Sequence, residues 1–323
     1  MRIAWIAYLS VMFLFGGLYA DVINKDEIKK VKKIAVISFY STPRVMCFEP
    51  KGGTGSLGLK DYVVKDPAKS DAPAGWKGAK QSEPELNALC QAALTIYQDS
   101  LSKAGYWEVV PFDKIKDNAG YKNTRVELTK VEENIAMSMM MSSMHNNRGG
   151  KSSEPAAEKP AKKTEAEYKA LYRTVEGMRC LPADMFREAG TTRMGGNDPY
   201  QNEKKALAEI CKSLGVDGVA IIHFNPLFKY GSWARLKVGE YVKGSPRIGA
   251  GMTVLSSDGK VVAETGDIVS KLGWDFEGST VNLIKNDELM LADKDVKDGY
   301  AATIGESAGR LKEILSKEFS KIK

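Results

Sequence analysis

A methionine-rich cluster near the middle of the chain carries side chains that bind soft metals. Its members are Met137, Met139, Met140, Met141, Met144 and His145. Thioether and imidazole groups suit Cu(I) in an exported protein, so a copper-handling protein is one hypothesis, with Met137, Met141, Met144 and His145 as ligands. Met137, either Met140 or Met141, and Met144 also share one face of a helix predicted from Arg125 to His145. Flexible thioethers fill adaptable apolar contacts, so a core or partner-binding surface is the favoured interpretation.

Hydrolytic catalysis usually needs a histidine base beside a serine or cysteine nucleophile. The chain has only two histidines, His145 at the edge of a predicted linker and His223 within an apolar strand. For His223 a structural role is favoured over that of a base. Two carboxylates from distant positions would leave no local motif, so a periplasmic carboxylate-based hydrolase stays an alternative, with Trp274 to Glu277 as one acidic-aromatic segment. We predict no catalytic residue and no enzyme activity.

Four cysteines could form two disulfides if the protein is exported to an oxidising compartment. Three pairings are open, and we favour Cys90 with Cys211 and Cys47 with Cys180. Cys90 and Cys211 are predicted on the inward faces of two helices that right-handed crossovers could bring side by side. Cys47 and Cys180 lie in two long excursions that would need a tether.

The N-terminus indicates export. Arg2 is followed by an apolar run from Ile3 to Phe15, the pair Gly16-Gly17, and Ala20 before the polar Asp21. This pattern predicts a Sec-type signal peptide over 1–20, cleaved between Ala20 and Asp21, and a periplasmic or secreted mature protein. The alternative is an uncleaved anchor helix, because the apolar run nearly reaches the length that spans a bilayer. No cysteine near Ala20 is available for a lipid, so we do not expect a lipoprotein.

Nucleotide and nucleic-acid binding are both disfavoured. Gly53 to Gly58 fits the G-x-G-x-x-G pattern, but it follows the preceding strand at a distance and does not lead into a helix. The chain has 47 Lys and Arg against 41 Asp and Glu, and the two signs are interleaved instead of forming a basic stripe. We therefore expect no nucleotide, no nucleic acid and no cofactor.

Apolar periodicity predicts a single α/β domain over 21–323, with a mixed sheet and flanking helices. Two segments, 41–81 and 117–202, are predicted as long excursions, and 146–163 is predicted as a disordered linker. The segment 21–33 is expected to be a polar lead-in outside the core. The predicted elements are strands at 33–39, 106–112 and 219–224, helices at 82–105, 165–176, 203–214 and 296–319, and a hairpin of 247–256 with 260–269.

This order and three phrases resemble a known group of envelope proteins. The phrases are Lys33 to Phe39, Leu101 to Val110 and Leu214 to Val219. They resemble the N-terminal domain of TolB and the related curli-secretion and penicillin-binding-protein-activator lipoproteins, over about 150 residues. The resemblance implies an anticodon-binding-domain-like core and a periplasmic or outer-membrane-associated binding protein. The chain departs from the group in lacking the lipidated cysteine and the β-propeller of TolB.

The sequence therefore predicts a non-enzymatic binding or assembly factor of the bacterial cell envelope. Its expected partners are other envelope proteins, outer-membrane or peptidoglycan-associated, and a homo-oligomer is compatible with this role. The methionine helix and the 41–81 excursion are expected to carry the partner contacts, because no packing role accounts for their length.

Overall fold

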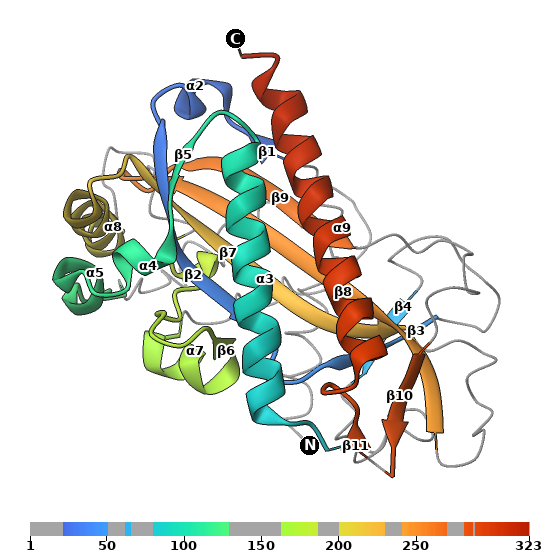
Figure 1. Ribbon diagram of the computed structural model, residues 1–323. Coiled ribbons are helices and arrows are strands. Elements are labelled where there is room, and N and C mark those ends of the chain that lie inside the picture. Colours follow the sequence, from blue (N-terminus) through green and yellow to red (C-terminus); the bar gives the residue numbers. More distant parts are fainter. Residues whose placement is uncertain are drawn as a thin grey trace, which may run out of the picture.

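The computed structural model describes residues 22–50, 62–65, 80–128, 163–186, 200–229, 241–269, 281–286 and 288–322. Eleven described strands form a mixed sheet, whose main path runs β1-β9-β8-β7-β2-β5. Helices flank this sheet, so the predicted α/β class with a mixed sheet is confirmed (Figure 1).

The middle of the sheet is parallel. Strand β2 (Lys33–Ser41) pairs in parallel with β5 (Glu108–Val110) on one side and with β7 (Gly218–Lys229) on the other. Both β2 and β7 are mainly apolar and rich in β-branched and aromatic residues, as expected for strands that are buried on both faces. The side chain of Asp217 fixes the start of this pair, because its Oδ2 accepts hydrogen bonds from the backbone N–H groups of Lys32 and Lys33, both at 2.9 Å.

The remainder of the main path is antiparallel. Strand β7 pairs with β8 (Tyr241–Ser256), and β8 pairs with β9 (Val261–Val269) across the turn predicted at Ser257-Asp258-Gly259. Gly259 has a positive φ of 81°, which accounts for a glycine at this position. Short strands extend the sheet: β1 (Val22–Ile23) lies on β9, β10 (Val281–Lys285) joins β8 to β11 (Glu288–Leu289), and β3 (Met46–Pro50) joins β7 to β4 (Tyr62–Lys65).

Two long helices lie side by side across one face of the sheet, which we call the front face (Figure 1). These are α3 (Glu83–Lys103) and α9 (Lys294–Phe319), and each buries a stripe of residues at helical spacing. Tyr97 of α3 donates a hydrogen bond to Ser307 of α9 at 2.7 Å, within the core. Ser82 and Glu85 have the spacing of a capping box at the start of α3, but the Ser82 side chain makes no capping hydrogen bond, so this sequence pattern does not form the cap here.

Shorter elements cover the opposite, back face. Helix α8 (Gln201–Leu214) ends at Gly215, in the left-handed conformation with φ 63°. Strand β7 lies on the opposite side of β2 from β5, so the right-handed crossover that leads from β5 through α8 to β7 places α8 on the face opposite α3. The remaining back-face and edge elements are α4 (Phe112–Ile115), α5 (Ala119–Asn123), α7 (Glu165–Leu171), β6 (Arg173–Thr174) and the 3₁₀ turn Ala183–Met185.

Several segments predicted outside the core are part of it. The lead-in forms β1 and helix α2 (Lys25–Ile28), and Ile28 and Val31 are fully buried. The expectation that 21–33 is not a core element is therefore wrong. Within the two excursions, β3 and β4 join the sheet, and Tyr121, Leu181 and Phe186 have no exposed surface. The helix predicted at Arg125 does not begin by residue 128, and its remainder lies outside the described residues.

Candidate functional site

Aromatic side chains gather on the back face near the end of β2. The ring of His223 stacks on Tyr40, with centroids 4.9 Å apart and planes 24° apart. Tyr172 packs edge-on against Tyr40 at 5.0 Å and lies 6.2 Å from His223, and Tyr168 lies 6.2 Å from Tyr172. We call Tyr40, Tyr168, Tyr172 and His223 the aromatic cluster.

The positions of these residues follow from local structure. Tyr40 and His223 are direct partners in the parallel β2–β7 register, so their side chains project from the same face. Tyr168 and Tyr172 are four residues apart at the end of α7, so they lie on one side of it. Helix α7 begins with a capping box in which the hydroxyl of Thr164 accepts from the backbone N–H of Glu167 at 3.3 Å, and the Glu167 carboxylate accepts from the backbone N–H of Thr164.

Burial sets the charge of the cluster. Desolvation lowers the pKa of His223 to about 4, so its imidazole is neutral at neutral pH. Its Nε2 atom is buried and has no hydrogen-bond partner among the described residues. Burial, followed by the negative charge of Asp184, raises the pKa of Tyr172 to about 12, and burial acts in the same direction on Tyr168 and Tyr40. The cluster is thus uncharged over the physiological range.

Polar contacts hold the segment 163–186 on the sheet. The Arg179 guanidinium donates to both carboxylate oxygens of Glu165, at 3.0 and 2.6 Å, and to the backbone carbonyl of Tyr121 at 2.7 Å. The Tyr121 hydroxyl accepts from the Arg179 backbone N–H at 3.0 Å and donates to the carbonyl of Ile37 at 2.7 Å. The hydroxyl of Ser38, also on β2, accepts a hydrogen bond from the backbone N–H of Leu181 at 3.0 Å. The segment is therefore fixed to the central strand β2.

The middle of this segment is anchored by Arg173, two residues after the exposed Leu171. Arg173 is clamped, with hydrogen bonds to Asn87 at 2.6 Å and to the carbonyl of Pro43 at 3.0 Å, and an ion pair with Glu83 at 2.5 Å. Leu171 is 47% exposed and is the exposed large hydrophobic residue of the described part. Leu171 directly precedes the half-buried Tyr172, and we call the exposed Leu171 together with Tyr172 the Leu171 surface.

The side chains of the aromatic cluster are suited to packing and hydrogen-bonding contacts rather than to proton transfer. A neutral, stacked imidazole and three tyrosines that keep their protons offer apolar area and hydroxyl hydrogen bonds. Within the described residues no group of three or more His, Cys, Asp or Glu side chains is placed to hold a metal ion.

All four cysteines lie in the described part of the chain, and all are buried, but none forms a disulfide. The structure thus differs from the predicted pairs Cys90–Cys211 and Cys47–Cys180. Cys90 belongs to α3 on the front face and points toward the sheet, where its Sγ lies 3.3 Å from the Ser41 hydroxyl. Cys211 belongs to α8 on the back face. Because the sheet separates the two helices, the crossover argument for this pair fails.

The second predicted pair is separated along the sheet. Cys47 is the register partner of Phe228, and Cys180 lies beside Ser38, the register partner of Ile221. Seven residues of β7 separate those two partners, which is roughly 23 Å at about 3.3 Å per residue. A disulfide needs Cα atoms less than about 7 Å apart. Burial instead raises the pKa of Cys180 and of Cys211 to about 12, so these thiols stay protonated.

The other candidate residues lie outside the described residues. These are Met137, Met141, Met144 and His145, the cleavage residues Ala20 and Asp21, the glycine-rich segment 53–58 and the acidic-aromatic segment 274–277. The copper and cleavage hypotheses therefore stay predictions.

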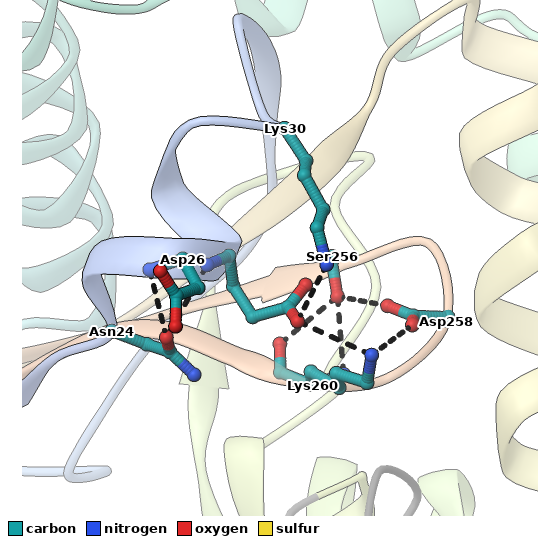
Figure 2. A network of polar contacts seen from close by, with 7 residues as sticks. Asn24, Asp26, Lys30, Ser256, Asp258 and Lys260 are labelled. Atoms are coloured by element: carbon teal, nitrogen blue, oxygen red, sulfur yellow. Dashed lines mark hydrogen bonds and ion pairs between the residues drawn. The ribbon is translucent and has the colours of Figure 1, made fainter.

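A second polar network joins the N-terminal segment to the β8–β9 turn (Figure 2). The buried carboxylate of Glu27 accepts from Lys30 at 2.9 Å and from Lys260 at 3.2 Å. Lys260 also pairs with Asp258 at 3.0 Å, and Asp258 accepts from the Ser256 hydroxyl. The hydrogen bond from Lys30 lowers the pKa of Glu27. This network has matched charges and closed hydrogen bonds, so we interpret it as a structural clasp for α2.

Sequence patterns single out only one member of the aromatic cluster, His223, and miss the tyrosines. The spacing of Tyr168 and Tyr172 is a visible signal, since residues four apart share a helix face. Nothing in the sequence indicates that α7 packs beside Tyr40, which is more than 120 positions away.

Comparisons with known proteins give no relative. The chain matches no protein-family model, and no curated protein and no solved structure is significantly similar to it. Of the helices in the described residues, none combines the length and apolar character needed to cross a membrane.

Proposed function

We propose that this protein is a non-enzymatic, exported binding or assembly factor of the bacterial cell envelope, acting in the periplasm or at the outer membrane. The observation that carries the proposal is the Leu171 surface. Leucine and tyrosine side chains at a rigid position supply contact area at low entropic cost, and aromatic residues are enriched at protein interfaces. The contacts of Arg179 and Arg173 give this surface the rigidity that recognition needs.

The fold adds indirect support. A parallel β2–β7 pair crossed by α3 in front and α8 behind agrees with the anticodon-binding-domain-like core implied by the resemblance to the TolB N-terminal domain. We propose membership of this envelope group on the strength of the resembling phrases. The signal-peptide pattern of residues 1–20 fits the same location.

Two alternatives remain from other classes. A carboxylate-based hydrolase would need two acids converging in a cleft, and a copper protein would need the methionine cluster. Metal analysis of the purified protein tests the copper hypothesis. Alanine substitutions of His223, Asp217 and Glu277 test the hydrolase hypothesis, although Asp217 also holds two backbone N–H groups and its loss should lower stability.

The proposed binding role is tested by comparing partners recovered from cross-linked envelopes. Leu171→Asp places a carboxylate in the apolar surface, and Ala92→Asp places one on the exposed side of α3 as a matched control. We expect Leu171→Asp to lose a partner that the wild type and Ala92→Asp retain. If all three proteins recover the same partners in the same yield, the Leu171 surface is not the binding site. If an alanine at His223 or Glu277 instead abolishes a measured turnover without unfolding the protein, an enzyme is indicated.

A further inference from the structure

Three helices end at the same extremity of the molecule. Helix α2 lies there with the last turns of α3 and α9, at the end where Figure 1 marks the C-terminus. The tyrosine Tyr106 joins them, because its hydroxyl donates to the carbonyl of Ile28 at 3.2 Å and its ring stacks on Phe319 at 4.7 Å. The hydroxyl of Ser316 donates to the carbonyl of Ala104 at 3.3 Å. Segments from both ends of the chain thus form one rigid surface.

Lysines dominate the exposed side chains of this surface, which we call the lysine end. They are Lys25, Lys29, Lys30, Lys32, Lys103, Lys317 and Lys321. The acidic residues nearby are Asp26, Glu27, Asp99, Glu108, Asp217, Asp258 and Glu318. Glu108 pairs with Lys33, Asp258 pairs with Lys260, and the Asp217 carboxylate accepts from the backbone N–H groups of Lys32 and Lys33. Glu27 is buried, Glu318 is half-buried and pairs with Lys321, and Asp99 pairs with Lys103. Within the described part of the chain, Lys25, Lys29 and Lys317 form no ion pair.

Lysines from two distant segments of the chain act on the same carboxylate, that of Glu318. The pKa of Glu318 on α9 is lowered mainly by the hydrogen bond from Lys321, with smaller contributions from the charges of Lys317 and Lys25. Lys32 lies over the ring of Tyr106, with its Nζ 4.1 Å from the centroid. Positive charge from segments almost 300 residues apart is therefore concentrated on one side.

We infer that the lysine end binds the surface of an anionic phospholipid bilayer. Clustered lysines next to a membrane are attracted by the negative charge of anionic lipid within a Debye length. With the lysine end against the bilayer, the Leu171 surface on the back face does not contact the bilayer. The inference is independent of which partner that surface binds.

Co-sedimentation of the full chain with vesicles tests this inference. The readout is the ratio of binding to phosphatidylglycerol vesicles over phosphatidylcholine vesicles, because an apolar anchor would insert into both. The test variant is Lys25→Glu/Lys29→Glu/Lys317→Glu. The control variant Lys114→Glu/Lys205→Glu/Lys294→Glu has the same charge change at exposed lysines elsewhere. We expect the ratio to fall about tenfold or more in the test variant only, and in the wild type to fall with added salt.

Two further measurements distinguish lipid binding from effects of folding and of general negative charge. Thermal unfolding of both variants, and of Lys25→Gln/Lys29→Gln/Lys317→Gln, separates loss of binding from loss of folding, since glutamine removes the charge without reversing it. Isolated peptidoglycan sacculi provide a second anionic surface. An unchanged lipid ratio in a folded test variant overturns the inference, as does a lysine dependence seen with sacculi and not with vesicles. An equal loss in both variants would also overturn it, because the effect would then follow net charge and not the lysine end.

Discussion

The two faces of the sheet are covered in different ways. On the front, two long helices bury regular apolar stripes, and a buried hydrogen bond from Tyr97 to Ser307 joins them. On the back, short elements are held by individual polar contacts, such as those of Arg179 and Tyr121. Stability on the front is spread over many contacts, whereas the position of the segment 163–186 on the back also depends on a few specific polar atoms. The back face therefore offers the positions where one substitution can change local structure without unfolding the molecule.

The largest effect is expected from the front face. Leu315 of α9 has no exposed surface, so Leu315→Ala should lower the free energy of unfolding by about 2 to 5 kcal/mol. Urea denaturation measures it. Leu171→Ala is the matched control, and the same truncation at that half-exposed position should cost much less. Equal costs at the two positions would contradict the proposed division between front and back.

Acid should act first on the back face. Because burial lowers the pKa of His223 to about 4, the folded state disfavours the imidazolium that the unfolded state accepts below pH 6.5. Above pH 6.5 the imidazole is neutral in both states and does not affect the free energy of unfolding. As the pH falls from 6.5 towards 4, the free energy of unfolding should fall by at most about 3 kcal/mol. His223→Phe keeps a ring against Tyr40 and cannot be protonated, so its stability should fall less over this range. Denaturation of both proteins at a series of pH values checks this, and parallel curves would show that other groups determine the acid response.

Loss of the Arg179 guanidinium should loosen the segment 163–186. Arg179→Met removes three hydrogen bonds and leaves the Tyr121 carbonyl without its donor, at an expected cost of about 1 to 3 kcal/mol. Limited proteolysis should cut within 163–186 while α3 and α9 stay protected. Glu165→Gln, which keeps the amide oxygen as an acceptor, should show a weaker form of the same change. Cleavage spread over the whole chain would instead mean that the two faces unfold together.

The smallest effect is expected at the clasp of Figure 2. Glu27→Gln removes the charge that pairs with Lys30 and Lys260, and the contribution of this pair should be lost in the wild type as pH falls through the lowered pKa of Glu27. The melting temperature should therefore fall slightly at neutral pH, and the difference from the wild type should shrink in high salt. A difference that is independent of salt would point to the hydrogen-bond geometry instead of the charge.

The elements that the sequence predicts are those with local signals, on both faces of the sheet. Helix α9 is predictable because Val296, Ile304, Leu311 and Leu315 recur at helical spacing, and β8–β9 because Asp258-Gly259 is a turn between apolar runs. Helix α8 ends at Gly215 as expected, since glycine adopts the left-handed conformation there. Periodicity and turn residues are local properties, and they suffice for these elements.

The aromatic cluster and the core role of the N-terminal segment could not be predicted in this way. Ile28 and Val31 stand among charged residues, so their burial depends on how the β8–β9 turn and Tyr106 meet α2. Tyr121 is isolated in a polar segment, and its burial depends on a backbone carbonyl of β2. Contacts between distant segments decide these positions, and no sequence pattern records them.

The pairing of β2 with β7 also constrains when the protein can fold. Lys33 and Asp217, which meet at the start of this pair, are 184 residues apart, and α9, which covers the front face, is the last element of the chain. The centre of the sheet consequently cannot close until most of the polypeptide is available, and its loop-closure entropy must be overcome first. The proposed export of the chain in an extended state would benefit from this delay, because the early segments would have no stable partner before transport. Refolding from urea should accordingly be slow and pass through intermediates, which stopped-flow fluorescence of Trp107 beside Phe319 would follow as α9 docks.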